Sequence, residues 1–194
     1  MRTEIAKLHQ RLNATIIYVT HDQTEAMTMA SKIIIMKDGL VHQTGDPQTV
    51  YDHPVNMFVA GFIGSPAMNF TDVVVTDSYK IVNPKFEIEA AGNIRKIVKD
   101  NNLFGKEFVL GIRPEDLEDY KFVHDARENC VINALVEVIE PMGSEIYAYV
   151  DILGVLFTAR VNPRSEAKVG QNIDLYVDVE KLHLFDKQTE KAYI

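Results

Sequence analysis

Cysteine, tryptophan and long apolar runs are scarce or missing in this chain of 194 residues. A single cysteine, Cys130, excludes an internal disulfide and a zinc site built from several cysteines. The longest apolar stretches, such as 16–19 and 33–36, are far shorter than the roughly 20 residues that a membrane-spanning helix needs. The first residues also lack the apolar stretch of a signal peptide. If the protein works at a membrane, we expect it to do so through a partner.

Basic residues are outnumbered as well, with 20 Lys and Arg against 28 Asp and Glu and a formal net charge of -8. Phosphate contacts need an excess of cations, so no nucleic-acid partner is expected. The glycine-rich phosphate loop with its Gly-Lys-Ser/Thr ending is also missing. What remains is ordinary for a soluble globular protein: 46% of residues are hydrophobic and 25% are charged.

The character of the sequence changes near residues 64–66. Before that point, helical and strand patterns alternate, whereas short strands and turns follow it. We therefore expect an α+β protein with a truncated α/β domain over residues 1–64 and an all-β domain over residues 65–194.

Apolar spacing predicts a helix over residues 2–12. The β-branched run Thr15–Thr20 is typical of a strand that is buried on both faces, and Lys32–Met36 predicts a second such strand. Between them, Asp22 and Glu25 resemble a capping box that opens a helix over residues 23–31. Since one crossover helix fits between the two strands, we expect them to be parallel.

Turn chemistry punctuates the rest of the first region. Asp38-Gly39 predicts a tight hairpin into residues 40–44. Asp46-Pro47 predicts the start of a short helix that ends near His53, and the apolar spacing over residues 58–62 indicates one more helix.

The second region shows clear alternation of apolar and polar residues. Four rows of alternating apolar residues predict strands over residues 130–138, 146–152, 155–161 and 173–179. Earlier candidates are Asp72–Thr76, Phe86–Ala90 and Glu107–Ile112. Short strands at this spacing indicate a small barrel or a sandwich, with Cys130 in its core.

His21 is the sharpest candidate for chemistry. It directly follows a predicted strand and directly precedes a capped helix, which is where ligands bind in open α/β sheets. An imidazole there can donate a hydrogen bond to a phosphate. Position alone leaves a second interpretation open, in which His21 is a capping or loop residue without a ligand.

The surrounding sequence adds to this interpretation. Residues 16–26, IIYVTHDQTEA, closely resemble the switch-histidine segment of ATP-binding-cassette (ABC) ATPases. Residues 37–70 resemble the end of the nucleotide-binding domain in the maltose-importer ATPase family. GIRPEDL (111–117), VEVIEPMGSE (136–145) and KLHLFDKQTEKAY (181–193) resemble that family's appended regulatory domain.

The resemblance implies that residues 1–64 are the end of an ABC nucleotide-binding domain and residues 65–194 an OB-like regulatory domain. It implies that His21 contacts the γ-phosphate of ATP, and that ATP and Mg²⁺ bind the intact parent, an ATPase. The phosphate loop, signature motif, magnesium-binding carboxylate and catalytic base of the family are missing here. We therefore expect this chain alone to bind no cofactor and to hydrolyse no ATP, and no metal ligands are expected in it.

Partners and place in the cell also follow from the resemblance. It implies a second copy of the chain, transmembrane permease subunits, a possible regulatory protein, and a cytoplasmic location on the inner face of the membrane. The transported solute is expected to be a carbohydrate. The alternative is a stand-alone regulatory module whose β domain recognises a small ligand or a partner protein.

Several other residues have plainer interpretations. Arg113, Pro114 and Glu115 are expected to be structural, since proline holds the preceding residues extended at a strand end. The acidic residues of 115–119 are expected to form a solvated face.

Tyr147 and Tyr149 share one strand face and suit either sugar stacking or a domain contact. The methionines 27, 29 and 36 are expected to pack in a core.

Overall fold

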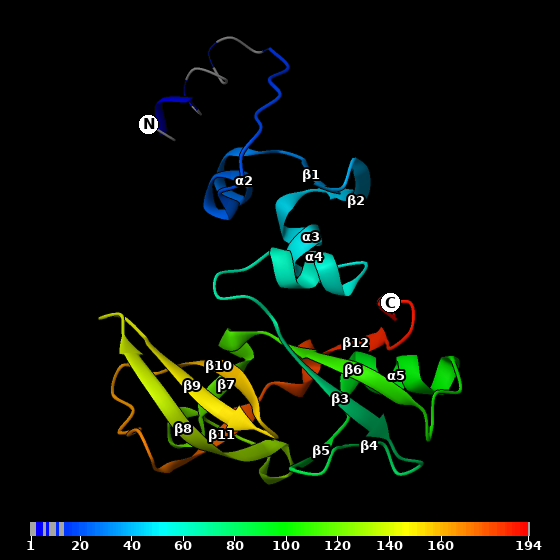
Figure 1. The fold of residues 1–194 in the computed structure, drawn as a ribbon, viewed down its shortest axis with the longest axis vertical. Coiled ribbons are helices and arrows are strands. Elements are labelled where there is room, and N and C mark those ends of the chain that lie inside the picture. Colours follow the sequence, from blue (N-terminus) through cyan, green and yellow to red (C-terminus); the bar gives the residue numbers. More distant parts are fainter. Residues whose placement is uncertain (1–2, 6, 8–10, 12–13, 194) are drawn as a thin grey trace. The chain divides into compact units, whose positions relative to one another are not determined.

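The structure, a computed structural model, describes residues 3–5, 7, 11 and 14–193. The chain divides into two compact units, Met1–Ser65 and Pro66–Ile194, called here the first unit and the β unit (Figure 1). Within the described ranges, no helix is both long enough and apolar enough to cross a membrane.

The first unit contains three described helices and one hairpin, in the order α2 (Gln23–Met29), β1 (Ile33–Lys37), β2 (Leu40–Gly45), α3 (Pro47–Asp52) and α4 (Met57–Phe62). The hairpin turn is as predicted: Asp38 and Gly39 have φ angles of 53° and 79°. Positive φ at both turn residues matches the twist of the paired strands. The start of α3 is also confirmed, because the Asp46 side chain accepts a hydrogen bond from the backbone N of Thr49.

A small hydrophobic core holds these elements together. Its buried members come from β1, α3, α4 and the residue after α4, and they are Ile33, Ile35, Val50, Val59 and Ile63. Ala26 and Met27 of α2 pack against it, so the helix that follows His21 is fixed to the rest of the first unit.

The prediction of a buried strand over Thr15–Thr20 is wrong. Residues 14–20 form neither a strand nor a helix, and Ile17 and Val19 are 89% and 91% exposed. A β-strand needs a hydrogen-bonded neighbour, and the only described partner of β1 is β2. The β-branched residues favour extended backbone, but no described strand pairs with them.

The prediction of a second strand, parallel to the first and buried on both faces, is wrong in two respects. β1 pairs antiparallel with β2, and its residues alternate between buried and exposed at Ile33, Ile34 and Ile35. Met36 is 57% exposed, so its expected packing role is not observed. The predicted helix over residues 2–12 lies largely outside the described residues.

The β unit consists of two five-stranded antiparallel sheets. The first has the order β12-β6-β3-β4-β5, with β3 (Asn69–Val75), β4 (Lys80–Val82), β5 (Glu87–Glu89), β6 (Glu107–Ile112) and β12 (His183–Asp186). The second has the order β10-β9-β8-β11-β7, with β7 (Leu117–Asp119), β8 (Val131–Pro141), β9 (Ile146–Ile152), β10 (Val155–Val161) and β11 (Asn172–Val177). Short 3₁₀ turns are η1 (Pro114–Asp116), η2 (Tyr120–Phe122), η3 (Glu128–Cys130) and η4 (Val179–Lys181).

Both sheets contribute to one continuous core, in which Leu110, Ala148 and Phe157 are fully buried. Cys130 is buried in this core, as expected. The expected all-β character needs one correction, because helix α5 (Gly92–Asp100) buries Ile94 and Val98 in the same core. Figure 1 shows α5 beside the sheet that contains β3 and β6.

Candidate functional site

The candidate site is the segment 18–25, called here the His21 loop, which follows the unpaired run 14–17 and includes the first residues of α2. His21 itself is exposed, and none of the described residues forms a hydrogen bond or ion pair with its side chain. The imidazole therefore faces solvent at the start of a helix whose own position is fixed by the first unit's core. A ligand that approaches this loop meets a free hydrogen-bond donor.

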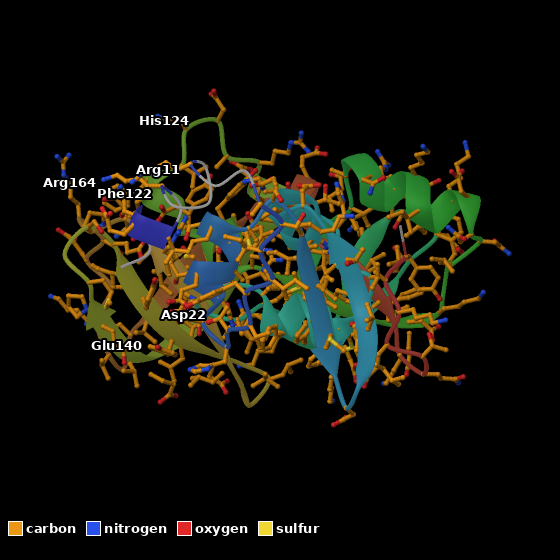
Figure 2. All side chains as sticks on the ribbon, turned by 90° about the horizontal axis from the view of Figure 1, so that it is seen from above. Arg11, Asp22, Phe122, His124, Glu140 and Arg164 are labelled. Atoms are coloured by element: carbon orange, nitrogen blue, oxygen red, sulfur yellow. The ribbon has the colours of Figure 1, made fainter. Side chains whose placement is uncertain are left out.

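Asp22 caps α2 in the predicted way. Its Oδ1 accepts hydrogen bonds from the backbone N of Thr24 at 2.8 Å and of Glu25 at 3.1 Å. These bonds satisfy two amide groups that the first turn of a helix leaves without intrahelical partners. Figure 2 labels Asp22 beside α2.

The second hydrogen bond of the predicted capping box, from the backbone N of Asp22 to Glu25, is not formed directly; the Thr20 hydroxyl lies between the two groups. Glu25 does not accept from the backbone N of Asp22; the Thr20 hydroxyl accepts that bond instead, at 3.0 Å. The Thr20 hydroxyl in turn donates a hydrogen bond to Oε2 of Glu25 at 2.6 Å. The Tyr18 hydroxyl donates a hydrogen bond to the same oxygen at 3.1 Å. Neither hydroxyl was expected from the sequence to take part in the site, although Tyr18 and Thr20 stand two residues apart and share one side of an extended chain.

The loop has negative charge around its histidine. Asp22 and Glu25 are both carboxylates, and the hydrogen bond to Glu25 raises the pKa of the Tyr18 hydroxyl. One imidazole among two carboxylates does not make an anion pocket, since phosphate binding relies on several cations or amide groups. The described residues of the loop therefore do not fit a complete triphosphate site.

A magnesium site does not fit either. Among the residues that the structure describes, no group of three or more His, Cys, Asp or Glu side chains could hold a metal ion. No step of a mechanism is therefore assigned to a metal held by this chain.

A hydrogen bond also joins the His21 loop to the last residues of the first unit. Oε1 of Gln23 accepts a hydrogen bond from the backbone N of Gly64 at 2.9 Å, across 41 residues of sequence. Gly64 has a φ of 122°, which other residues rarely adopt. The residue two positions after His21 is thus connected to the last residues of its unit.

The segment Arg113–Glu115 lies away from His21 in sequence and belongs to the β unit. Arg113 is buried and extended immediately after β6, and Pro114 begins η1. This agrees with the geometry expected before a proline. A catalytic role for these residues gains no support.

The expectation that the acidic residues of 115–119 form a solvated face is wrong for Asp116 and Asp119, which are both 4% exposed. Asp119 accepts hydrogen bonds from the Ser165 hydroxyl and the backbone N of Lys121. Asp116 lies 3.4 Å from the ammonium group of Lys181. Burial raises the pKa of Asp116 to about 6, although Lys181 acts in the opposite direction.

Tyr147 and Tyr149 point to the outer face of β9, because Ala148 and Val150 on the other face are buried. Their hydroxyls donate to Glu145 and Glu140 at 2.8 and 2.9 Å. Both carboxylates raise the pKa of the tyrosine that they contact. Sugar stacking and a protein contact both remain compatible with this arrangement.

Comparison with known families gives two matches in the β unit. Residues 64–117 match the MalK OB fold domain, and residues 110–185 match the TOBE domain. The MalK OB fold match begins at Gly64, two residues before the first residue of the β unit.

Relatives extend over almost the whole chain. The ABC transporter ATP-binding protein YcjV of Escherichia coli O157:H7 is 46% identical and covers 99% of the chain. The oligosaccharides import ATP-binding protein MsmX of Bacillus subtilis is 45% identical over 98%, and the trehalose/maltose import ATP-binding protein MalK of Thermococcus litoralis is 42% identical over 99%. The chain spans about half the length of these curated relatives, 52% in each case. These findings confirm the resemblance of the chain to ABC transporter ATP-binding proteins with a MalK-type regulatory domain.

Proposed function

We propose that this chain, a relative of ABC transporter ATP-binding proteins with a MalK-type OB fold and a TOBE domain, is the C-terminal part of the ATP-hydrolysing subunit of a bacterial carbohydrate importer. The observation that carries the proposal is the identity of 42–46% to ABC transporter ATP-binding proteins over 99% of the chain. Two of these relatives are named for the import of oligosaccharides and of trehalose and maltose, which favours a carbohydrate as the imported solute.

In this proposal, residues 1–64 are the end of the nucleotide-binding domain and His21 donates a hydrogen bond to the γ-phosphate of ATP. The exposed imidazole on a fixed loop supports this role, because phosphoryl transfer depends on placed donors that stabilise charge in the transition state. The remaining phosphate contacts, the Mg²⁺ ligands and the base belong to a part of the subunit outside this chain. ATP and Mg²⁺ therefore act in the whole subunit, which works at the inner face of the membrane with permease subunits.

ATP hydrolysis tests the assignment of His21. The 194-residue chain should show no magnesium-dependent turnover. In the full-length subunit assembled with its permease, His21→Ala should lower the turnover number by about 100-fold or more while ATP binding changes little. Wild-type turnover in that variant would show that the assignment is wrong.

We further propose that the β unit is regulatory and joins two copies of the subunit. The outer face of the sheet β10-β9-β8-β11 carries exposed apolar side chains, with Leu135 and Leu156 on either side of Asp151 and Val138 opposite Tyr149. An apolar sheet face of this kind is typical of a protein interface. A second copy presents the same surface, as a two-fold interface requires.

Light scattering tests the dimer. The chain should have twice the monomer mass of 22.0 kDa, and Leu156→Lys should convert it into a folded monomer. Val41→Lys, at an equally apolar exposed position of the first unit, is the matched control and should leave the dimer intact. Dissociation by Val41→Lys instead would place the contact on the first unit.

A second candidate function is a stand-alone binding module. The β unit favours it, because its core is continuous and independent of the smaller core of the first unit. A ligand that binds the native state raises its melting temperature. A thermal-shift screen of sugars, oxyanions and nucleotides therefore tests this alternative: a saturable shift supports it, and a flat screen with an active full-length ATPase opposes it.

A further inference from the structure

The hydrogen bonds around His21 hold the two residues that flank it. Thr20 precedes His21 and Asp22 follows it, and the Thr20 hydroxyl accepts from the backbone N of Asp22 at 3.0 Å. This bond closes a small ring across the histidine. The position of the His21 backbone is thus defined by its neighbours, while its side chain stays free.

Glu25 anchors that ring to α2. Its Oε2 accepts from the Thr20 hydroxyl at 2.6 Å and from the Tyr18 hydroxyl at 3.1 Å. A hydroxyl that donates to a carboxylate makes a short, strong bond and becomes a better acceptor for a second donor. Glu25 therefore strengthens the bond between Thr20 and the Asp22 amide without touching His21.

We propose that Glu25 is a positioning residue for His21, acting through the Thr20 hydroxyl. This inference rests on the proposed function of His21 as a γ-phosphate contact. In phosphoryl transfer, a donor displaced by about 1 Å lowers the rate by roughly 100-fold. Glu25 keeps the imidazole within reach of the phosphate, whereas ATP affinity depends mainly on other contacts.

A role confined to helix stability is the competing explanation, and Thr28 separates the two. Thr28 also lies on α2, and its hydroxyl donates to the backbone O of Thr24 at 2.5 Å. Among the described residues, no hydrogen bond joins the Thr28 side chain directly to Thr20, His21 or Asp22. Thr28→Val thus removes a hydroxyl from the same helix and serves as the matched control for Thr20→Val.

The first measurement follows amide hydrogen exchange in the 194-residue chain by NMR. Thr20→Val and Glu25→Ala should speed exchange of the Asp22 amide by about 3- to 10-fold, the range expected for loss of one hydrogen bond. Thr20→Ser should restore the wild-type rate, and Thr28→Val should not change it. Equal exchange in all these proteins would overturn the proposed link between Glu25 and the ring.

The second measurement is ATP turnover of the full-length subunit in its transporter. Thr20→Val and Glu25→Ala should lower kcat by at least about 10-fold with KM for ATP changed less than about twofold. Glu25→Gln, which keeps an acceptor oxygen, should retain part of kcat, and Thr20→Ser should retain nearly all of it. Thr28→Val should match the wild type.

The outcomes separate the two hypotheses. If His21→Ala abolishes turnover while Glu25→Ala and Thr20→Val keep wild-type kcat, the positioning role is overturned and the proposed function stands. If His21→Ala itself has no effect on kcat, the proposed function fails and the positioning role fails with it. A fall in kcat for Thr28→Val equal to that for Thr20→Val would show that only helix stability matters.

Discussion

Replacing Asp116 by asparagine should stabilise the β unit at neutral pH. The Asp116 side chain is 3% exposed, and its charged partner, the Lys181 ammonium, lies 3.4 Å away and is itself mostly in solvent. Lys181 also contacts Asp178 at 3.1 Å, so its charge is shared between two carboxylates. One shared, hydrated cation does not compensate fully for the burial of a carboxylate.

The size of the effect follows from the pKa. Burial raises the pKa of Asp116 from an ordinary value of 3.8 to about 6. Each tenfold change in proton affinity corresponds to about 1.4 kcal/mol, so the ionised carboxylate costs the folded state about 3 kcal/mol at pH 7. Asparagine keeps the shape of the side chain and carries no charge, so Asp116→Asn should recover part of that free energy, up to about 3 kcal/mol.

The sign of the pH dependence is fixed by the same numbers. Because the folded state holds the proton more tightly, this group favours folding below pH 3.8, and its contribution is lost as the pH rises to about 6. Asp46 and Asp186 have lowered pKa values, so their contributions run in the opposite direction. The difference between wild type and Asp116→Asn isolates Asp116 from them.

Urea unfolding followed by circular dichroism of the β-sheets measures the free energy of unfolding at several pH values. The advantage of Asp116→Asn should be near zero at pH 4 and largest above pH 6.5. Lys181→Met should destabilise the protein above pH 6, since it leaves Asp116 buried without a cation. Equal pH dependence in wild type and Asp116→Asn, or a less stable variant at pH 7, would refute the reasoning.

Three further changes test local features of the structure. Gly111→Ala should lower the free energy of unfolding by about 1–3 kcal/mol. The reason is that a Cβ atom would lie 2.5 Å from Sδ of Met68 and 2.8 Å from the Phe185 ring. A loss below about 0.5 kcal/mol in urea unfolding would show that the side chains around Gly111 can relax. Asn56→Ala should destabilise the first unit by about 1 kcal/mol, because its Oδ1 caps α4 at the backbone N of Val59, while Asn56→Asp keeps the cap and should unfold at nearly the wild-type urea concentration. Gln23→Ala should speed amide exchange at Gly64, which donates to Gln23; unchanged exchange there would mean that the link does not persist in solution.

Local signals in the sequence predicted local structure well. Asp38-Gly39, Asp46-Pro47 and the cap at Asp22 all have the expected geometry. In each case the chemistry that sets the conformation lies within four residues, so no distant contact can override it. The four alternating rows of the β unit also became strands, because their apolar faces meet in one core.

Features without a local signal were missed. Helix α5 begins after Ala91, which makes no side-chain cap, so nothing in the sequence marked its start. Asp116 belongs to an acidic run that looked solvated, and its burial depends on the distant segment 178–181. The hydrogen bonds from Tyr18 and Thr20 to Glu25 also lack a local signal, because the sequence predicts a strand at these residues and a strand assigns no partner to their hydroxyls.

The run Thr15–Thr20 has the sequence pattern of a buried strand, but the structure contains no strand there. Its β-branched residues match a strand between two neighbours, yet Ile17 and Val19 are almost fully exposed and no described strand pairs with them. Apolar surface that stays in water, such as that of Ile17 and Val19, costs about 25 cal/mol per Å² relative to buried surface. The pattern therefore indicates the environment that the segment suits, and the structure shows that the described chain does not supply it. In the proposed full-length subunit, we expect a neighbouring strand to cover these residues.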